Sequence, residues 1–325
     1  MNVALITGLN GQDGSYIADL LLSKGYEVHG TIRTGAMLDP NKLRNIAHIK
    51  DNIVLHELSL EDFTGLSLLF NQIKPDEIYH FASPSTIQYS FAGESSLLNL
   101  NLTCTNYLLS LIYERKQSCR FFFAGSSEIF GYTNTLFQNE QTPLQPRSLY
   151  GIAKANGYFI TKYFRERKNI HSSTGIMYNH ESVRRGNQFA TKYICREVVK
   201  ICKTGQGKIK VGNLNSKRDW GYAPDYVQAI WKIMQQDNGD DYIISTGELN
   251  SIREIIDLAF SIIKGEGYDW EPFVEIVPDI ETEPFQSSLC GIPDKLTRII
   301  NWKRSKSFRQ IIEEIVNYEI EKVNL

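Results

Sequence analysis

The stretch Val3–Gly14, VALITGLNGQDG, decides the fold. Its apolar run Val3–Thr7 is typical of a short buried strand, and glycines follow at Gly8, Gly11 and Gly14 before a helical pattern begins. This spacing permits a tight turn, lets the backbone approach a pyrophosphate, and lets the helix pack closely on the strand. The N–H groups at the helix N-terminus then face the phosphates. The stretch therefore predicts a strand–turn–helix unit that binds a dinucleotide.

Beyond this unit, strand-like and helical segments alternate up to about residue 180. The further strand candidates are Tyr26–Ile32, Ile53–His56, Asp76–Ala82, Arg120–Ala124 and Ser173–Tyr178. The helical candidates between them are 61–73, 96–115 and 149–168. Such alternation is typical of βαβ units and a parallel sheet. We expect an α/β fold with a doubly wound parallel (Rossmann) sheet over residues 1–180, to which residues 219–248 return.

The second half of the chain loses this rhythm. Its candidates are helices at 190–203, 224–236 and 251–263, strands at 208–212 and Tyr242–Ser245, and an amphipathic helix that includes 308–316. Four prolines punctuate the stretch from Pro272 to Pro293. We expect a smaller, mixed substrate-binding domain formed by residues 181–218 and 249–325. In this architecture ligands sit in the crevice at the carboxyl ends of the strands.

Composition excludes several classes of protein. The 325 residues carry 35 basic and 37 acidic side chains, so no basic excess exists to neutralise a nucleic acid. No apolar run approaches the ~18 residues of a membrane helix, and the N-terminus lacks a signal-peptide pattern. The five cysteines show no C-x-x-C spacing, which indicates reduced core thiols and no metal site. We expect a soluble, cytoplasmic protein that binds neither nucleic acid nor membrane.

The end of the second strand candidate bears on the choice of cofactor. An acidic residue there commonly holds the adenosine ribose of NAD, whereas this chain has Arg33. A guanidinium suits a 2′-phosphate, so NADP is favoured over NAD. The alternative is that Arg33 is an ordinary solvated surface residue.

Two further patterns carry candidate catalytic groups. Tyr150 and Lys154 lie four residues apart, on one helix face, and a nearby cation favours the phenolate needed to deprotonate a hydroxyl. Ser126 and Glu128 follow the strand candidate that ends at Ala124. Ser126 can bond a substrate oxygen, and Glu128 can act as a general acid and base. The alternative for Glu128 is a solvated loop residue.

Together these residues resemble the extended short-chain dehydrogenase/reductase superfamily and, within it, the GDP-mannose 4,6-dehydratase family. The resemblance spans nearly the whole chain. The most specific stretches are Leu5–Gly8 with Gly11–Tyr16, Pro146–Tyr150, Asn179–Gly186 (NHESVRRG) and Gly212–Gly221 (GNLNSKRDWG).

The resemblance implies an NADP-dependent hydro-lyase that converts GDP-mannose, or a related GDP-sugar, to its 4-keto-6-deoxy product by internal hydride transfer from C4 to C6. It implies the catalytic set Ser126, Glu128, Tyr150 and Lys154. The implied cofactor contacts are Gly8, Gly11, Gln12, Asp13, Gly14, Arg33, Ser59, Leu60, Phe81, Ala82, Ser83, Ser85, Tyr150, Lys154, His180 and Arg185. The implied substrate contacts are Ser85, Ser126, Glu128, Asn179, Lys192 and Arg218. It also implies a homodimer or homotetramer, in which a loop starting near Arg33 reaches the neighbouring subunit.

Several positions depart from the family pattern. Thr34 replaces a second arginine and Ser59 replaces an aspartate near the adenine. Tyr193 stands at a nucleotide-contacting lysine, and Glu283-Pro284 at an Arg-Pro pair. These changes leave open a dehydratase for a different sugar nucleotide. Two more hypotheses are a 4-epimerase or reductase of the superfamily and a catalytically silent NADP-binding protein. A complete catalytic set that includes Glu128 argues against both.

Overall fold

A seven-stranded, fully parallel sheet forms the centre of the computed structural model, which describes residues 1–83, 91–115, 117–277 and 289–324. Its strands, in spatial order, are β12 (Asp241–Ile244), β7 (Ser172–Met177), β5 (Arg120–Ser126), β4 (Glu77–His80), β1 (Val3–Thr7), β2 (Glu27–Ile32) and β3 (Val54–Glu57). The order reverses between β1 and β4, because the chain adds β2 and β3 on one side and the other strands on the opposite side. The predicted doubly wound sheet is confirmed.

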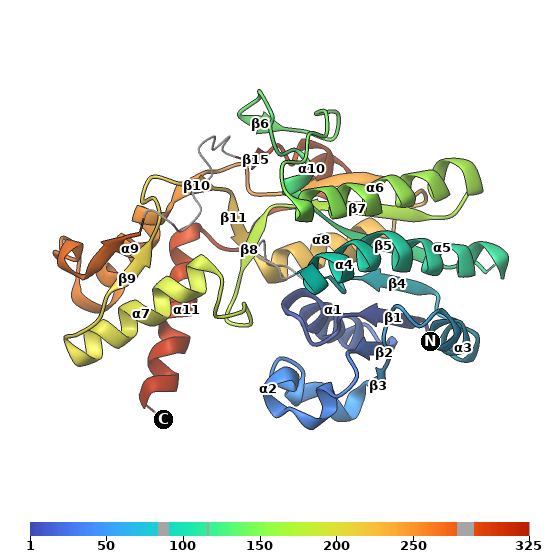
Figure 1. Cartoon of the computed structure of the whole chain (residues 1–325), viewed down its shortest axis with the longest axis horizontal. Coiled ribbons are helices and arrows are strands. Elements are labelled where there is room, and N and C mark those ends of the chain that lie inside the picture. The colour runs from blue at the N-terminus through green and yellow to red at the C-terminus, as the bar shows by residue number, and fades with distance from the viewer. Residues whose placement is uncertain (84–90, 116, 278–288, 325) are drawn as a thin grey trace.

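Helices cover both faces of this sheet (Figure 1). On one face α1 (Gln12–Ser23) packs against α8 (Ala223–Met234), through residues such as Ile17 and Ile230. On the other face lie α3 (Phe63–Ile73), α5 (Thr105–Glu114) and α6 (Leu149–Lys168). Successive β5 residues alternate between the faces, so that Phe121 and Phe123 join the α3–α5–α6 core and Phe122 joins the other core.

The helix predicted over 96–115 is interrupted. The structure has α4 (Phe91–Asn99), then a π-helical turn at Leu100–Cys104, then α5. The Asn101 side chain donates to the carbonyl of Leu97 at 2.9 Å and to Ser83 Oγ at 2.9 Å. A side chain that enters the backbone ladder in this way is a known cause of such bulges. The turn therefore places Asn101 against the segment that follows β4.

The sequence predicts no helix between β2 and β3, whereas the structure has short helical turns there. This segment forms the short helix α2 (Pro40–Leu43), with 3₁₀ turns at Ala36–Leu38 and Ala47–Asn52. The Asp39 side chain caps α2 by accepting the N–H of Asn41. The segment lies at the end of the sheet where β2 delivers Arg33.

A second hydrophobic cluster belongs to the C-terminal part, at the left of Figure 1. It joins α7 (Ala190–Thr204), α9 (Ile252–Lys264) and α11 (Phe308–Asn324) with the strand pair β9 (Ile209–Val211) and β14 (Val274–Ile276). The other short strand pairs are β8 (Asn179–Glu181) with β11 (Trp220–Tyr222), β10 (Lys217–Arg218) with β13 (Asn250–Ser251), and β6 (Phe137–Gln138) with β15 (Cys290–Gly291). The short helix α10 (Asp294–Ile300) follows β15. The predicted domain boundaries stay a prediction, although β12, from the predicted returning stretch, lies in the large sheet. Among the described residues, no helix combines the length and apolarity needed to cross a membrane.

Candidate active site

A cleft of about 800 Å³ opens where the chain leaves β1, β2, β3 and β4. This is the point at which the strand order reverses, where folds of this kind bind ligands. Its lining includes most of the predicted cofactor contacts: Gly8, Gly11, Gln12, Asp13, Gly14, Arg33, Ser59, Leu60, Phe81, Ala82, Ser83 and Arg185. Ser85 lies outside the described residues.

The glycine turn leaves room for a ligand by excluding side chains. Gly8 has a φ of +71°, and a Cβ there would come within 3.0 Å of the Ala82 backbone. A Cβ at Gly14 would collide with the Gly8 carbonyl oxygen. Gly11, the N-cap of α1, supplies no side-chain cap for the first N–H groups of that helix. This arrangement fits the pyrophosphate of a dinucleotide.

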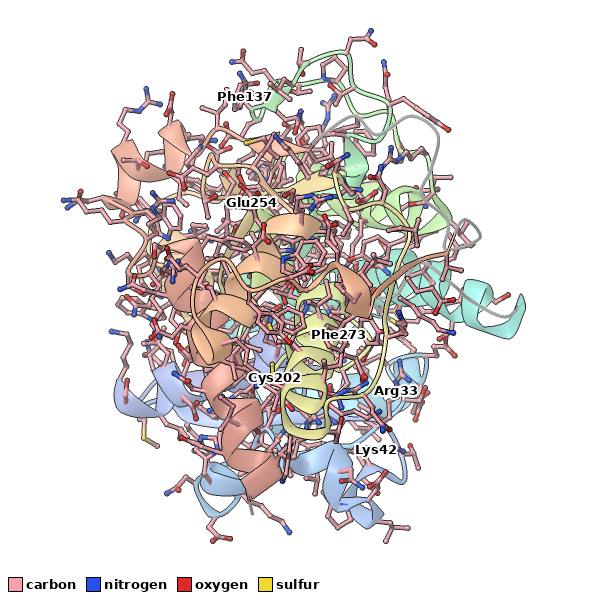
Figure 2. The ribbon with its side chains drawn as sticks, turned by 90° about the vertical axis from the view of Figure 1, so that its left-hand side faces the viewer. Arg33, Lys42, Phe137, Cys202, Glu254 and Phe273 are labelled. Atoms are coloured by element: carbon pink, nitrogen blue, oxygen red, sulfur yellow. The ribbon has the colours of Figure 1, made fainter. Side chains whose placement is uncertain are left out.

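Three basic side chains line the end of the cleft beyond β2. Arg33 is exposed there, near Lys42 of α2 (Figure 2). Arg44, just after α2, also lines the cleft. Asn10 of the glycine turn holds this segment by donating to the Lys42 carbonyl at 3.0 Å, and Asn45 donates to the Asn10 carbonyl at 3.3 Å. Sequence reasoning found only Arg33, because nothing local indicated that α2 folds back onto the glycine turn.

The side chains of Gln12 and Asp13 bind residues of the 179–186 stretch. Asp13 accepts from Nε2 of His180 through both oxygens, at 3.0 Å each. Gln12 donates to the His180 carbonyl at 3.1 Å and accepts from the Ser182 hydroxyl at 2.8 Å. Burial alone would lower the pKa of His180, but the Asp13 carboxylate raises it overall. Burial would likewise raise the pKa of Asp13, but His180 brings it below its usual value.

Arg185 reaches the cleft from the same stretch. Its guanidinium lies 3.6 Å from the ring centroid of Phe189, and its Nε is 3.4 Å from a carboxylate oxygen of the buried Glu181. That Nε and that oxygen have no hydrogen-bond partner among the described residues. Burial raises the pKa of Glu181, and Arg185 opposes that shift. Arg185 is therefore placed to take an anionic ligand.

The catalytic candidates gather at the end of β5, the neighbour of β4. Ser126 is the last residue of β5, and its hydroxyl accepts the N–H of Glu128 at 3.2 Å. Glu128 lies in a 3₁₀ turn whose carbonyl would be 2.5 Å from a Cβ at Gly151, so this turn packs directly on the start of α6. Ser148 caps that helix by accepting the Gly151 N–H. Local sequence thus brings Ser126 and Glu128 beside the first turn of α6.

The first turns of α6 carry Tyr150 and Lys154. The Nζ of Lys154 lies 5.7 Å from the Tyr150 ring centroid and donates to the Ala124 carbonyl at 2.9 Å. Lys154 is buried, and this burial lowers its pKa to about 7, while the Asp13 carboxylate acts in the opposite direction. The two residues lie on one helix face, as the sequence predicted.

The predicted substrate contacts divide into two groups. Asn179 of β8 is paired in register with Trp220 of β11, and Arg218 lies two residues before Trp220. Lys192 points elsewhere: its Nζ is 2.7 Å from Glu319 of α11 and donates to the Val183 carbonyl at 3.1 Å. A buried ammonium needs such partners, so Lys192 joins α7 to α11 and is not offered to a ligand here.

The remaining departures from the family pattern have mixed outcomes. The hydroxyl of Tyr193 accepts the N–H of Lys210 in β9 at 3.1 Å, so this side chain lies against β9. Glu283-Pro284 falls outside the described residues. The described part of the chain holds no cluster of three or more histidine, cysteine or acidic side chains suited to a metal ion.

A second cleft, of about 620 Å³, lies between α6, β12 and α10. Several of its charged side chains pair with one another: Arg165 with Asp241 at 2.7 Å, Lys295 with Asp240 at 2.5 Å, and Lys162 with Glu166. None of the predicted cofactor, substrate or catalytic residues lines it. The cleft at the strand reversal is lined by most of the predicted cofactor contacts and is therefore the candidate cofactor site, with the catalytic candidates at the end of the neighbouring strand β5.

Comparison with known proteins agrees with this geometry. A family model described as GDP-mannose 4,6 dehydratase matches residues 5–315. The chain belongs to the GDP-mannose 4,6-dehydratase family. Among its relatives, the human GDP-mannose 4,6 dehydratase is 37% identical, covering 98% of this chain and 92% of that protein. The GDP-mannose 4,6 dehydratase 2 of Caenorhabditis elegans is 38% identical, covering 98% of this chain and 89% of that protein.

Solved structures share the fold of this family member at lower identity. A dTDP-glucose 4,6-dehydratase from Bacillus anthracis, in complex with NAD, has a TM-score of 0.83 at 18% identity and covers 100% of this chain and 98% of its own. RMD from Pseudomonas aeruginosa, complexed with NADPH, has a TM-score of 0.80 at 20% identity and covers 99% of this chain and 100% of its own. These likenesses support the fold.

Proposed function

We propose that this chain is a nucleotide-sugar 4,6-dehydratase that acts on GDP-mannose or a related GDP-sugar. The observation that carries the proposal is the position of Glu128, which follows Ser126 at the end of β5 and packs on the helix turn of Tyr150. An oxidoreductase acting on an alcohol needs only the tyrosine and the lysine. A proton abstraction next to a carbonyl requires a further base, and Glu128, on a turn whose backbone packs against the helix of Tyr150, carries a carboxylate that can supply it.

The cleft at the strand reversal fits a nicotinamide dinucleotide, as the glycine turn and the uncapped start of α1 indicate. When bound, the nicotinamide ring would supply the two-electron acceptor for C4 and the donor for C6. Arg33, Lys42 and Arg44 support NADP over NAD, because they line the cleft beyond β2, where an arginine follows the strand in place of an acidic residue. Arg185 would hold the phosphates.

Tyr150 would take the proton of the sugar's 4-hydroxyl as C4 is oxidised. The Lys154 ammonium, 5.7 Å from the Tyr150 ring centroid, favours the phenolate form of the tyrosine. Burial lowers the pKa of Lys154 and the Asp13 carboxylate opposes that fall, which together leave the pKa at about 7. Asp13 therefore helps to keep this cation at neutral pH.

Glu128 would then remove the C5 proton, which the 4-keto group has made acidic. The same carboxyl group can donate that proton to the departing 6-hydroxyl, so that water leaves. Ser126 would hydrogen-bond the reacting oxygen at C4. Asn179 and Arg218 remain proposed contacts of the nucleotide diphosphate.

The test is incubation of the purified protein with GDP-mannose and with UDP-, CDP- and dTDP-hexoses. A 4-keto-6-deoxy product, detected by its absorbance in alkali, is expected with a GDP-hexose. A C4 epimer without loss of water would favour the epimerase alternative. Absence of any product would favour the silent binding protein. If product forms only from a UDP-, CDP- or dTDP-hexose, the enzyme uses a different sugar nucleotide. The tyrosine at position 193, where the family has a nucleotide-contacting lysine, makes this a specific alternative.

Replacing Arg33 by alanine is expected to weaken NADP binding by about tenfold or more, since a charge-assisted bond to phosphate contributes about 1.5–3 kcal/mol. NAD binding should change little, because NAD has no 2′-phosphate. Calorimetric titration of both cofactors measures the difference. Lys50→Ala, at an exposed cation outside the cleft, is the matched control. Equal losses for both cofactors would mean that Arg33 is a surface charge.

A homodimer or homotetramer is part of the same proposal. The supporting observation is a row of large exposed side chains on α6, where Ile152, Phe159 and Tyr163 are 43%, 55% and 48% exposed. Their spacing of seven and four residues places them on one helix face. A second copy of this chain is the proposed partner for that face. Separately, we propose that the protein acts in the cytoplasm.

A further inference from the structure

We infer that the His180 side chain supports cofactor binding indirectly, by neutralising the Asp13 carboxylate at the edge of the pyrophosphate site. The imidazole is then a positioning group and not itself a ligand of the cofactor. The inference deepens the cofactor part of the proposed function and rests on it. Its basis is the arrangement of buried partners around the two side chains.

Both ring nitrogens of His180 are occupied within the protein. Nδ1 donates to the Tyr178 carbonyl at 2.7 Å, and Nε2 donates to Asp13. The ring is buried and stacks on the Tyr226 ring, with centroids 4.7 Å apart and planes at 25°. A ring with both N–H groups engaged and one face covered has no donor left for a phosphate or a ribose.

Asp13, in contrast, lies at the ligand. It lines the cleft and stands in the first turn of α1, whose N–H groups face the pyrophosphate in folds of this type. An unbalanced carboxylate at that place would repel the phosphates. Its charge is balanced by His180, and Gln12 adds a neutral donor at 3.2 Å.

Further charged groups also act on the pair. Arg185 and Glu181 lie on the same stretch as His180 and are paired with each other at 3.4 Å. Arg185 lowers the pKa of both Asp13 and His180, whereas Asp13 and its hydrogen bond raise that of His180. From α6, Lys154 is coupled to Asp13, which opposes the fall in the pKa of Lys154 that burial causes. The carboxylate therefore serves the catalytic cation, and His180 makes it compatible with the phosphates.

The two roles predict a specific pattern in a double-mutant cycle. His180→Asn keeps a side chain of similar size but removes the positive charge, so the dissociation constant of NADPH should rise by about tenfold or more. In the double variant Asp13→Asn/His180→Asn neither charge remains, and the constant should return to within about threefold of wild type. Asp13→Asn alone should also bind NADPH. The readout is fluorescence titration of the full-length chain without sugar nucleotide, and thermal unfolding of each variant checks that it is folded.

A second measurement covers the case in which His180→Asn does not fold. In the wild-type protein NADPH affinity should fall as pH rises and His180 loses its proton, because Asp13 is then unbalanced. In Asp13→Asn this fall of NADPH affinity with pH should be absent. Protonation of the NADPH phosphates affects the wild type and the variant equally, so it cancels when their pH profiles are compared. The Asp13→Asn variant should also show a change in turnover that is distinct from its change in binding. Without the Asp13 carboxylate the Lys154 ammonium loses its proton at lower pH, so the high-pH limb of the kcat profile should move to lower pH.

The outcomes distinguish this inference from the function on which it rests. If the wild-type chain binds no nicotinamide dinucleotide, the proposed function fails and the inference fails with it. If the wild type binds NADPH but the double variant stays as weak as His180→Asn, His180 contacts the cofactor directly and the inference is overturned. The same conclusion follows if the pH dependence of Asp13→Asn equals that of wild type.

Discussion

Tyr150→Phe is expected to lower kcat by about 10²–10⁴-fold, the usual cost of losing a general base. The ring is retained, so its packing at the start of α6 and the 5.7 Å approach of Lys154 should persist. Cofactor binding and the thermal unfolding midpoint should therefore stay close to wild type. Initial rates of 4-keto-6-deoxy product formation measure kcat, titration with NADPH measures cofactor binding, and a thermal unfolding curve measures the midpoint.

Tyr113→Phe is the matched control, because Tyr113 is a half-exposed phenol near the end of α5, outside the cofactor cleft and the proposed oligomer face. It should keep wild-type turnover. A Tyr150→Phe variant that retains more than about a tenth of the activity would remove Tyr150 from the mechanism.

Glu128→Gln is expected to block the reaction after C4 has been oxidised. Glutamine keeps the shape of the side chain but cannot accept the C5 proton, so deoxy product should fall by about 10²–10⁴-fold. Solvent deuterium should fail to enter C5. A 4-keto sugar nucleotide that retains its 6-hydroxyl should be present, and borodeuteride reduction followed by mass spectrometry would label it at C4.

Glu166→Gln provides the control for this variant, because Glu166 is an exposed carboxylate of α6 in the second, charge-paired cleft. It should form product and incorporate deuterium at the wild-type rate. Normal deoxy-sugar formation by Glu128→Gln would assign the C5 proton to a different residue. Deuterium exchange at C5 without product would instead limit Glu128 to expulsion of the 6-hydroxyl.

Features encoded within one turn or one βαβ unit could be predicted from the sequence. The glycine turn follows β1 as expected, since Gly8 and Gly14 occupy positions where a Cβ would collide with backbone. The side-by-side placement of Tyr150 and Lys154 follows from helical periodicity alone. Strand candidates such as Val3–Thr7 and Arg120–Ala124 match the sheet because central parallel strands, buried on both faces, are short and largely apolar runs.

Features that depend on distant partners could not be predicted. Asp13 and His180 are 167 residues apart, and only their meeting shows that each satisfies the other. The resemblance assigns Lys192 to the substrate, whereas its partner in the structure, Glu319, belongs to the last helix. The π-helical turn carries the contact of Asn101 with Ser83, and the segment that brings Lys42 to the cleft is held by the bond from Asn10 to the Lys42 carbonyl.

The seventh strand, β12, has a consequence for how this chain is made. It pairs with β7, yet it is synthesised after β8, α7 and α8, so the large sheet stays incomplete while those segments emerge from the ribosome. Until then β7 is an unprotected edge, with backbone groups free to pair with another nascent chain. A fragment that ends near residue 180 should therefore aggregate during expression.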